Sequence, residues 1–167
     1  MKIIIGISLF LLLMSAPALS QQATVEPSFA LSIGIGSIYN GIGGNVAYVS
    51  EQDMKYVSYG CTEITTDNKL SECGFGIGWI RTDLFNADTN KHGIGIYLSQ
   101  VDEEFTFNIN NPENFHKQNI LALGLSYTYF HNGINNSGFN AGFSVDVNNG
   151  DGRKSRYGSF LQVGYQF

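Results

Sequence analysis

The last eleven residues, 157–167, constrain the fold most strongly. Bulky apolar side chains occupy every second position up to the final residue: Leu161, Val163, Tyr165 and Phe167. The intervening positions are small or polar, with Phe160 as the one bulky exception. A period of two residues indicates a β-strand. Because chain termini usually fray, an apolar face that reaches the last residue is unusual for a water-soluble sheet.

Seven earlier segments show the same alternation and predict seven more strands: 28–38, 42–50, 54–61, 73–82, 92–100, 120–130 and 138–148. In the clearest of them, Phe75, Ile77 and Trp79 alternate with glycines. These segments suit a tilted membrane strand, which needs roughly 9–11 residues. Turn residues separate them, so each strand is expected to pair with the next.

The face opposite the apolar one decides between two kinds of barrel. A soluble barrel of the lipocalin kind would carry charged residues there, whereas this chain carries Gly, Ser, Ala, Asn and Gln. Such a face suits a narrow interior, with Asp146 as its main charge. The sequence therefore predicts an all-β, closed, antiparallel, up-and-down transmembrane β-barrel of eight strands. Tyr127, Tyr129, Tyr165 and Phe167 are expected at strand ends, in an aromatic girdle, with Arg81 reaching toward headgroups.

In its alternating strands and its aromatic C-terminus, the chain resembles the small outer-membrane β-barrel proteins of the OmpA/OmpX type. The resemblance is one of pattern, and it implies residence in the bacterial outer membrane, in contact with lipid and lipopolysaccharide. It also implies that Leu161, Val163, Tyr165 and Phe167 form the signal read by the barrel-assembly machinery.

The N-terminus reads as a cleaved secretory signal peptide over residues 1–20. Lys2 precedes an apolar run of about twelve residues, and Ala18 and Ser20 provide a small-x-small cleavage site. The alternative is a membrane anchor, but the run is short of the roughly 20 residues that a spanning helix needs. We therefore expect residues 21–167 to form a single barrel domain.

The net charge restricts the possible partners, and the two cysteines indicate a structural bond. Nine Lys and Arg stand against fourteen Asp and Glu, and the net charge of −5 argues against a nucleic-acid partner. Cys61 and Cys73 flank a polar segment, and in an oxidising compartment we expect them to form a structural disulfide. A redox pair or a metal site is the alternative, but the spacing is not C-x-x-C and no His lies nearby.

If both termini lie in the periplasm, the connections 39–41, 62–72, 101–119 and 149–155 face outward. Phe105, Phe107 and Ile109 alternate within the longest of these and predict a hairpin suited to strand pairing with a partner. Arg153, Lys154 and Arg156 form a basic cluster suited to lipopolysaccharide phosphates. For the hairpin, the alternative is one that packs against its neighbours without a partner. For the basic cluster, the alternative is a solvated charged loop.

The sequence gives no catalytic residue, cofactor or metal site to predict. His116 lies in an acidic connection, where a divalent cation site is the alternative and a solvated loop is the commoner interpretation. Lipid A deacylases of the outer membrane use a His and a Ser two residues apart, and none of the three His has a Ser there. We expect a monomeric, non-enzymatic surface protein that presents loops to a host or envelope partner. The alternatives are a narrow pore, a soluble periplasmic ligand-binding barrel and a lipid-modifying enzyme.

Overall fold

The computed structural model describes residues 27–63, 72–85, 89–102, 119–149 and 157–167. Its strands are β1 (Ser28–Gly36), β2 (Gly41–Val49), β3 (Asp53–Glu63), β4 (Glu72–Arg81), β5 (His92–Asp102), β6 (Asn119–Phe130), β7 (Gly138–Asn148) and β8 (Tyr157–Gln166). Two short 3-10 helices are also present, η2 (Ser37–Tyr39) and η3 (Asp83–Phe85). The strand ends differ from those expected by at most two residues.

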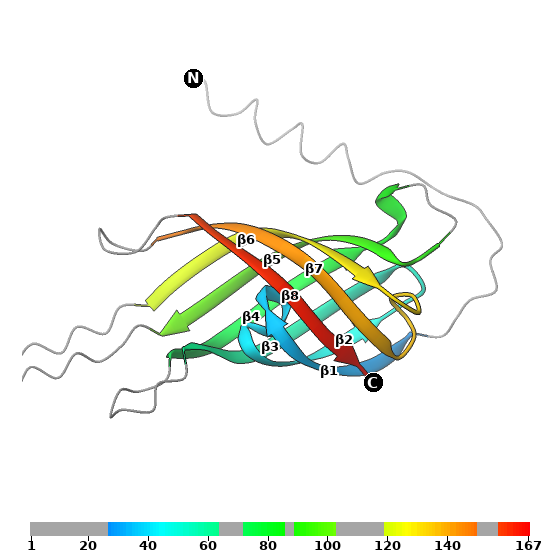
Figure 1. Cartoon of the computed structure of the whole chain (residues 1–167), viewed down its shortest axis with the longest axis horizontal. Coiled ribbons are helices and arrows are strands. Elements are labelled where there is room, and N and C mark those ends of the chain that lie inside the picture. Colours follow the sequence, from blue (N-terminus) through cyan, green and yellow to red (C-terminus); the bar gives the residue numbers. More distant parts are fainter. Residues whose placement is uncertain (1–26, 64–71, 86–88, 103–118, 150–156) are drawn as a thin grey trace, which may run out of the picture.

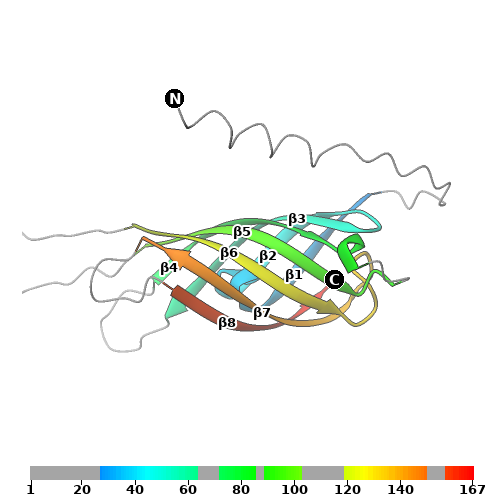
Figure 2. The same cartoon turned by 90° about the horizontal axis from the view of Figure 1, so that it is seen from above.

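Each strand pairs antiparallel with the next in the chain, and β8 pairs with β1 to close the sheet (Figures 1 and 2). The described residues therefore form an all-β, eight-stranded, up-and-down closed barrel. This confirms the predicted strand number, order and closure. Closure pairs the first strand with the last, which removes most of the unpaired edge that an open sheet would leave.

The two faces of each strand lie as the alternation predicts. On β4, Phe75 and Ile77 point outward and are 64% and 54% exposed, whereas Gly74 and Gly76 are buried against the lumen. On β6, Leu123 and Leu125 point outward, and Ser126 is buried inside. The large apolar side chains thus cover the outside of the barrel, and small or polar side chains line its inside.

The barrel has two unlike ends. At the terminal rim, β1 begins and β8 ends, and short turns join β2 to β3 and β6 to β7. At the loop rim, β3, β5 and β7 end and β4, β6 and β8 begin. Figure 1 shows the terminal rim on the right, with the C-terminus, and the loop rim on the left.

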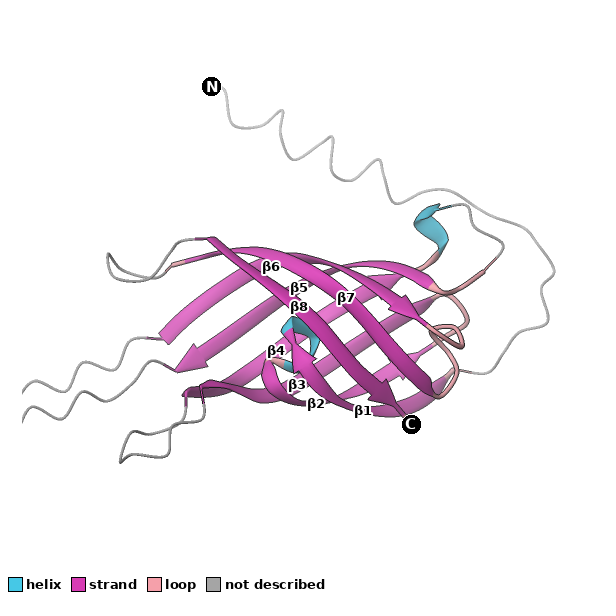
Figure 3. Cartoon of the chain, in the orientation of Figure 1, coloured by secondary structure: helices cyan, strands magenta, loops and turns pink. Residues whose placement is uncertain are grey.

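The connection between β1 and β2 is short, as predicted for residues 39–41, but it does not project beyond the strands as a loop. It is a tight turn, but it folds into the lumen as η2, seen within the ring of strands in Figure 3. Ile38 and Tyr39 are 0% exposed, and η2 contacts the strands β1 to β5 and β8. Gly36, Asn40 and Gly41 take φ angles of 120°, 56° and 100°, which the reversal into the lumen requires.

Because this connection turns inward, β1 and β2 reach less far toward the loop rim than the strands beside them. The ladder between β1 and β8 runs only from Ser32–Gln166 to Ile35–Val163, whereas β7 pairs with β8 up to Tyr157. Beyond Val163, β8 therefore has a partner strand on one side only. Phe160, which faces the lumen, is 46% exposed there, whereas Gln162 on the same face is 3% exposed.

Candidate functional site

The outer surface is the most extensive candidate site. All eight strands contribute large apolar side chains that are about half exposed, such as Ile33, Val57, Ile96 and Val145. A contiguous exposed apolar surface of this size is rare on a monomeric soluble protein. We call this surface the apolar belt.

Aromatic side chains gather in four outward-facing groups around the terminal rim: Phe29 with Tyr48, Trp79 with Lys55 and Arg81, His92 with Tyr127 and Tyr129, and Tyr165 with Phe139 and Phe167. Ring centroids within the last group are 5.0 Å apart. Aromatic rings combine an apolar body with a polar edge or tip, so they favour the boundary between apolar and aqueous surroundings. The predicted girdle residues Tyr127, Tyr129, Tyr165 and Phe167 all lie here.

The terminal-rim half of the lumen is a packed apolar core. Val49, Met54, Ile80, Phe130 and Ile134 are each at most 2% exposed. The turn between β6 and β7 carries Ile134 into this core, and its amide donates to the Asn90 carbonyl over 3.0 Å. The described residues therefore close the barrel at this end.

Three tyrosines cross the middle of the lumen. The Tyr39 hydroxyl donates to Asn140 Oδ1 over 2.8 Å, which ties η2 to β7. Tyr56 and Tyr97 each lie against a glycine directly opposite in the next strand, Gly78 and Gly124. The rings use the space that the missing side chains leave, so the abundant lumen glycines are packing positions.

Asp146 on β7 stands opposite Gly124, which in turn stands opposite Tyr97, and it is 7% exposed. It accepts a hydrogen bond from the Tyr97 hydroxyl over 3.0 Å. The two ion pairs that join described side chains lie elsewhere, at Lys55–Asp53 and Arg81–Asp83. Asp146 thus faces the lumen, as its position in the alternation predicts, and its carboxylate accepts from a tyrosine hydroxyl.

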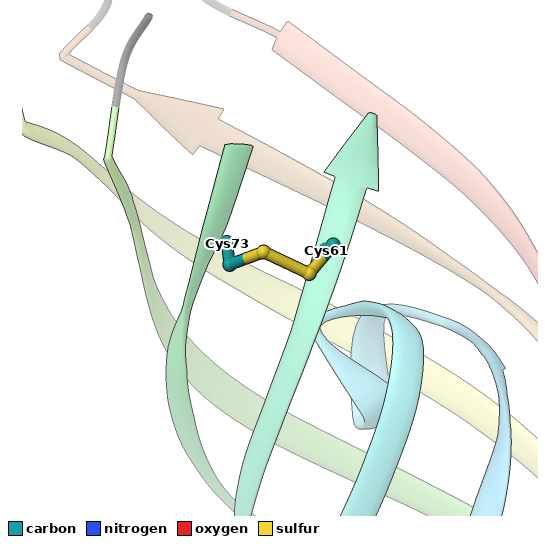
Figure 4. Close-up of a disulfide and its surroundings, with 2 residues drawn as sticks. All are labelled: Cys61 and Cys73. Atoms are coloured by element: carbon teal, nitrogen blue, oxygen red, sulfur yellow. A yellow bond between two sulfur atoms is a disulfide. The ribbon is translucent and has the colours of Figure 1, made fainter. Parts of the chain in front are cut away.

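Cys61 and Cys73 stand directly opposite each other on β3 and β4, near the loop rim (Figure 4). Their Sγ atoms are 2.01 Å apart, which is disulfide distance. The pairing of the two cysteines expected from the sequence is therefore supported. The bond would hold together the two strands that flank residues 64–71.

The other sequence-predicted site residues divide into two sets. Leu161, Val163 and Phe167 lie on the outer face of the last strand and its end, at 84%, 53% and 59% exposure, and Tyr165 shares that face. The Phe167 amide donates to the Leu31 carbonyl over 2.8 Å, so the last residue is tied to β1. The loop residues lie outside the described ranges: Phe105, Phe107, Ile109, His116, Arg153, Lys154 and Arg156.

Within the described ranges, no three or more His, Cys, Asp or Glu side chains gather as a metal site would require. The same part of the chain contains no helix with the length and hydropathy needed to cross a membrane.

Sequence reasoning missed the inward fold of η2. Its only signal is the brevity of the connection, since a Tyr-Asn-Gly turn by itself does not show which way it folds.

Comparison with known proteins adds no assignment, because no protein family, curated protein or solved structure matches this chain. The class of protein therefore rests on the geometry alone. The chain is a closed, eight-stranded, antiparallel β-barrel with an apolar outer face and a lumen packed at one end.

Proposed function

We propose that this protein is an integral outer-membrane β-barrel of the OmpA/OmpX type, without enzymatic activity, that presents its loop-rim connections for recognition, adhesion or envelope integrity. The observation that carries the proposal is the apolar belt together with the aromatic groups at the terminal rim. A spanning barrel needs this combination, because lipid contacts the belt and the aromatic rings sit at its polar boundary.

The orientation of the apolar side chains argues against a soluble ligand-binding barrel. Such a protein would turn its large apolar residues inward, toward a ligand, and its charged residues outward. Here Leu31, Ile33, Val57 and Leu125 point outward, each at least half exposed. Water on this surface would be strongly unfavourable, because each fully buried Leu or Ile contributes roughly 1.5–3 kcal/mol relative to exposure.

The packing of the lumen argues against a pore. The core around Met54, Ile80 and Ile134 fills the terminal-rim half, and η2 fills part of the middle. An eight-stranded barrel has an interior just wide enough for side chains, so little space is left for a solute path. We expect the purified protein to give no conductance steps in a planar bilayer; steps that vanish on heat denaturation would restore the pore as a candidate.

In this proposal both ends of the chain lie on the periplasmic side, where a secreted barrel begins its assembly. The terminal rim then faces the periplasm, and the connections 64–71, 103–118 and 150–156 belong to the cell surface. Display at the surface is the function that this topology favours, with a host or envelope protein and lipopolysaccharide as the partners.

A charge placed in the belt tests membrane residence directly. Leu125 and Leu84 are exposed to the same degree, 56% and 58%, but Leu125 lies in the middle of β6 and Leu84 lies in η3 beyond the end of β4. If lipid surrounds the belt, Leu125→Lys should cost about 2–4 kcal/mol and Leu84→Lys about 0–1. In water, both substitutions would be nearly neutral, since surface changes stay within about 0.5 kcal/mol.

The readouts are membrane fractionation and the shift in gel mobility on boiling, because folded barrels stay compact in detergent until they are heated. The wild-type chain should appear in the outer-membrane fraction with a heat-dependent shift. A protein that stays in the aqueous fraction, and tolerates Leu125→Lys as well as Leu84→Lys, would refute membrane residence.

A further inference from the structure

The apolar belt contains a groove on its outer surface, which reaches from Phe29 of β1 across β2 to β5 and onto β6. It has a volume of about 570 Å³ and is lined by outward side chains, chiefly Val46, Lys55, Val57, Ile77, Trp79 and Ile96. The backbone of β4 at Gly78 also lines it. This volume lies within the roughly 300–1,000 Å³ range of small-ligand sites. We call it the belt groove.

Lys55 is the charged residue that lines the belt groove, toward the terminal rim, and Arg81 lies beside it across Trp79. Lys55 Nζ and Arg81 Cζ are 6.0 Å and 5.5 Å from the centroid of the Trp79 ring, so two cations flank one indole. Lys55 stands directly opposite Trp79 in the ladder, and Arg81 stands opposite Asp53. The cations thus occupy the aromatic rim, where a lipid headgroup would meet an embedded barrel.

Two carboxylates accompany these cations. Arg81 donates to Asp83 through Nε over 2.9 Å and through Nη2. Lys55 Nζ is 3.9 Å from Asp53 Oδ2, and the Lys55 side chain is 59% exposed, so this pair is loose. Lys55 lines the groove, and Asp53, Arg81 and Asp83 lie next to it, so both signs of charge stand beside this end of the groove.

We propose that the belt groove is a specific binding site for one glycerophospholipid with a phosphoethanolamine headgroup. Lys55, aided by Arg81, binds the phosphate. Asp53 and Asp83 bind the ammonium. An acyl chain lies along Val57, Ile77 and Ile96. Charge complementarity selects this occupant. A purely anionic headgroup would face two carboxylates, and an uncharged lipid would make no ionic contact with either pair.

This inference rests on the proposed function, since it needs an embedded barrel. It also fits the proposed orientation, in which the terminal rim meets the periplasmic leaflet, where phospholipids reside. Phospholipid held in this groove would cover the belt across β3 and β4.

Native mass spectrometry of the protein in a mild non-ionic detergent tests the site, with titration of phosphatidylethanolamine and, separately, phosphatidylglycerol. The wild type should retain one phosphatidylethanolamine in preference to phosphatidylglycerol. Lys55→Ala should bind it about tenfold more weakly, as the loss of a charge-assisted contact implies. Ile96→Trp, which fills the groove, should weaken binding to a similar extent.

Two matched variants serve as controls. Lys91→Ala removes a cation from the same end of the barrel but outside the groove, and Val145→Trp enlarges a side chain on β7 with the same exposure as Ile96. Both should bind phosphatidylethanolamine like the wild type. Each variant is first checked for the heat-dependent shift, and Lys55→Gln replaces Lys55→Ala if the latter does not fold.

The outcomes separate the two proposals. If the chain is not membrane-inserted, the proposed function fails, and the groove has no lipid to bind. If it is inserted but binds both lipids equally, or loses no affinity in Lys55→Ala and Ile96→Trp, the lipid site is refuted and the proposed function stands.

Discussion

The ring of Tyr97 occupies the space that a side chain would need at Gly124, directly opposite it in the ladder. A Cβ atom at Gly124 would lie 2.4 Å from Tyr97 Cζ, and the hydroxyl of the same ring donates to Asp146 over 3.0 Å. The ring is thus fixed between a glycine on β6 and a carboxylate on β7.

This relationship predicts that Gly124→Ala destabilises the barrel by about 1–3 kcal/mol, the usual cost of overpacking. The added methyl group must displace the Tyr97 ring and weaken its bond to Asp146. Urea unfolding followed by the fluorescence of Trp79, the single tryptophan, gives the free energy of unfolding. In the double variant Gly124→Ala with Tyr97→Ala, the alanine should add little further cost. Strictly additive costs would contradict the relationship.

Tyr39 gives a second prediction, because it is 0% exposed and joins η2 to β7. Tyr39→Phe should cost about 1–3 kcal/mol, since it leaves the buried Asn140 oxygen without its donor. Tyr39→Ala should cost about 3–5 kcal/mol through the cavity that it leaves. Urea midpoints measure both, with the outward-facing Tyr48→Phe as a near-neutral control. A Tyr39→Ala protein as stable as the wild type would show that η2 does not brace the lumen.

The pairing of Cys61 with Cys73 predicts that neither thiol reacts with an alkylating reagent until a reductant is added. Mass spectrometry of the intact protein detects the added groups. The double variant Cys61→Ser with Cys73→Ser should lose roughly 3 kcal/mol, the loop-entropy contribution of a bridge of this span. Two thiols that react without reductant would refute the disulfide.

Phe167 is expected to act during assembly. Phe167→Ala should lower the fraction of protein that reaches the membrane with a heat-dependent shift, because the terminal aromatic residue belongs to the expected assembly signal. Phe139→Ala is the matched control: Phe139 is 66% exposed against 59% for Phe167, lies in the same aromatic group, and is internal to the chain. Equal defects in the two variants would indicate loss of aromatic packing instead of loss of a signal.

The barrel itself follows from features that act locally. Alternation over two residues sets which side chains face outward, and short turns set which strands pair, so 73–82 and 138–148 are recognisable as strands without knowledge of the rest. The placement of Asp146 in the lumen and of Arg81 on the outer face follows from the same alternation.

What the sequence did not predict depends on contacts between distant residues. The inward turn of η2 is held by Tyr39 with Asn140 and by Ser37 with Gln162, partners far along the chain. The belt groove likewise combines side chains from β1 to β6, and no single strand carries a sign of it. Such features require the register between strands, which the local pattern does not specify.

The inward connection between β1 and β2 has a mechanical consequence for the whole cylinder. Because β1 stops at Gly36, the first and last strands meet along a seam much shorter than the one between β7 and β8. Hydrogen bonds along a short seam break together at low cost, so amide hydrogens there should exchange with solvent ahead of those in the other ladders. The seam between β1 and β8, which closes the barrel, is therefore also the place where the barrel should open first.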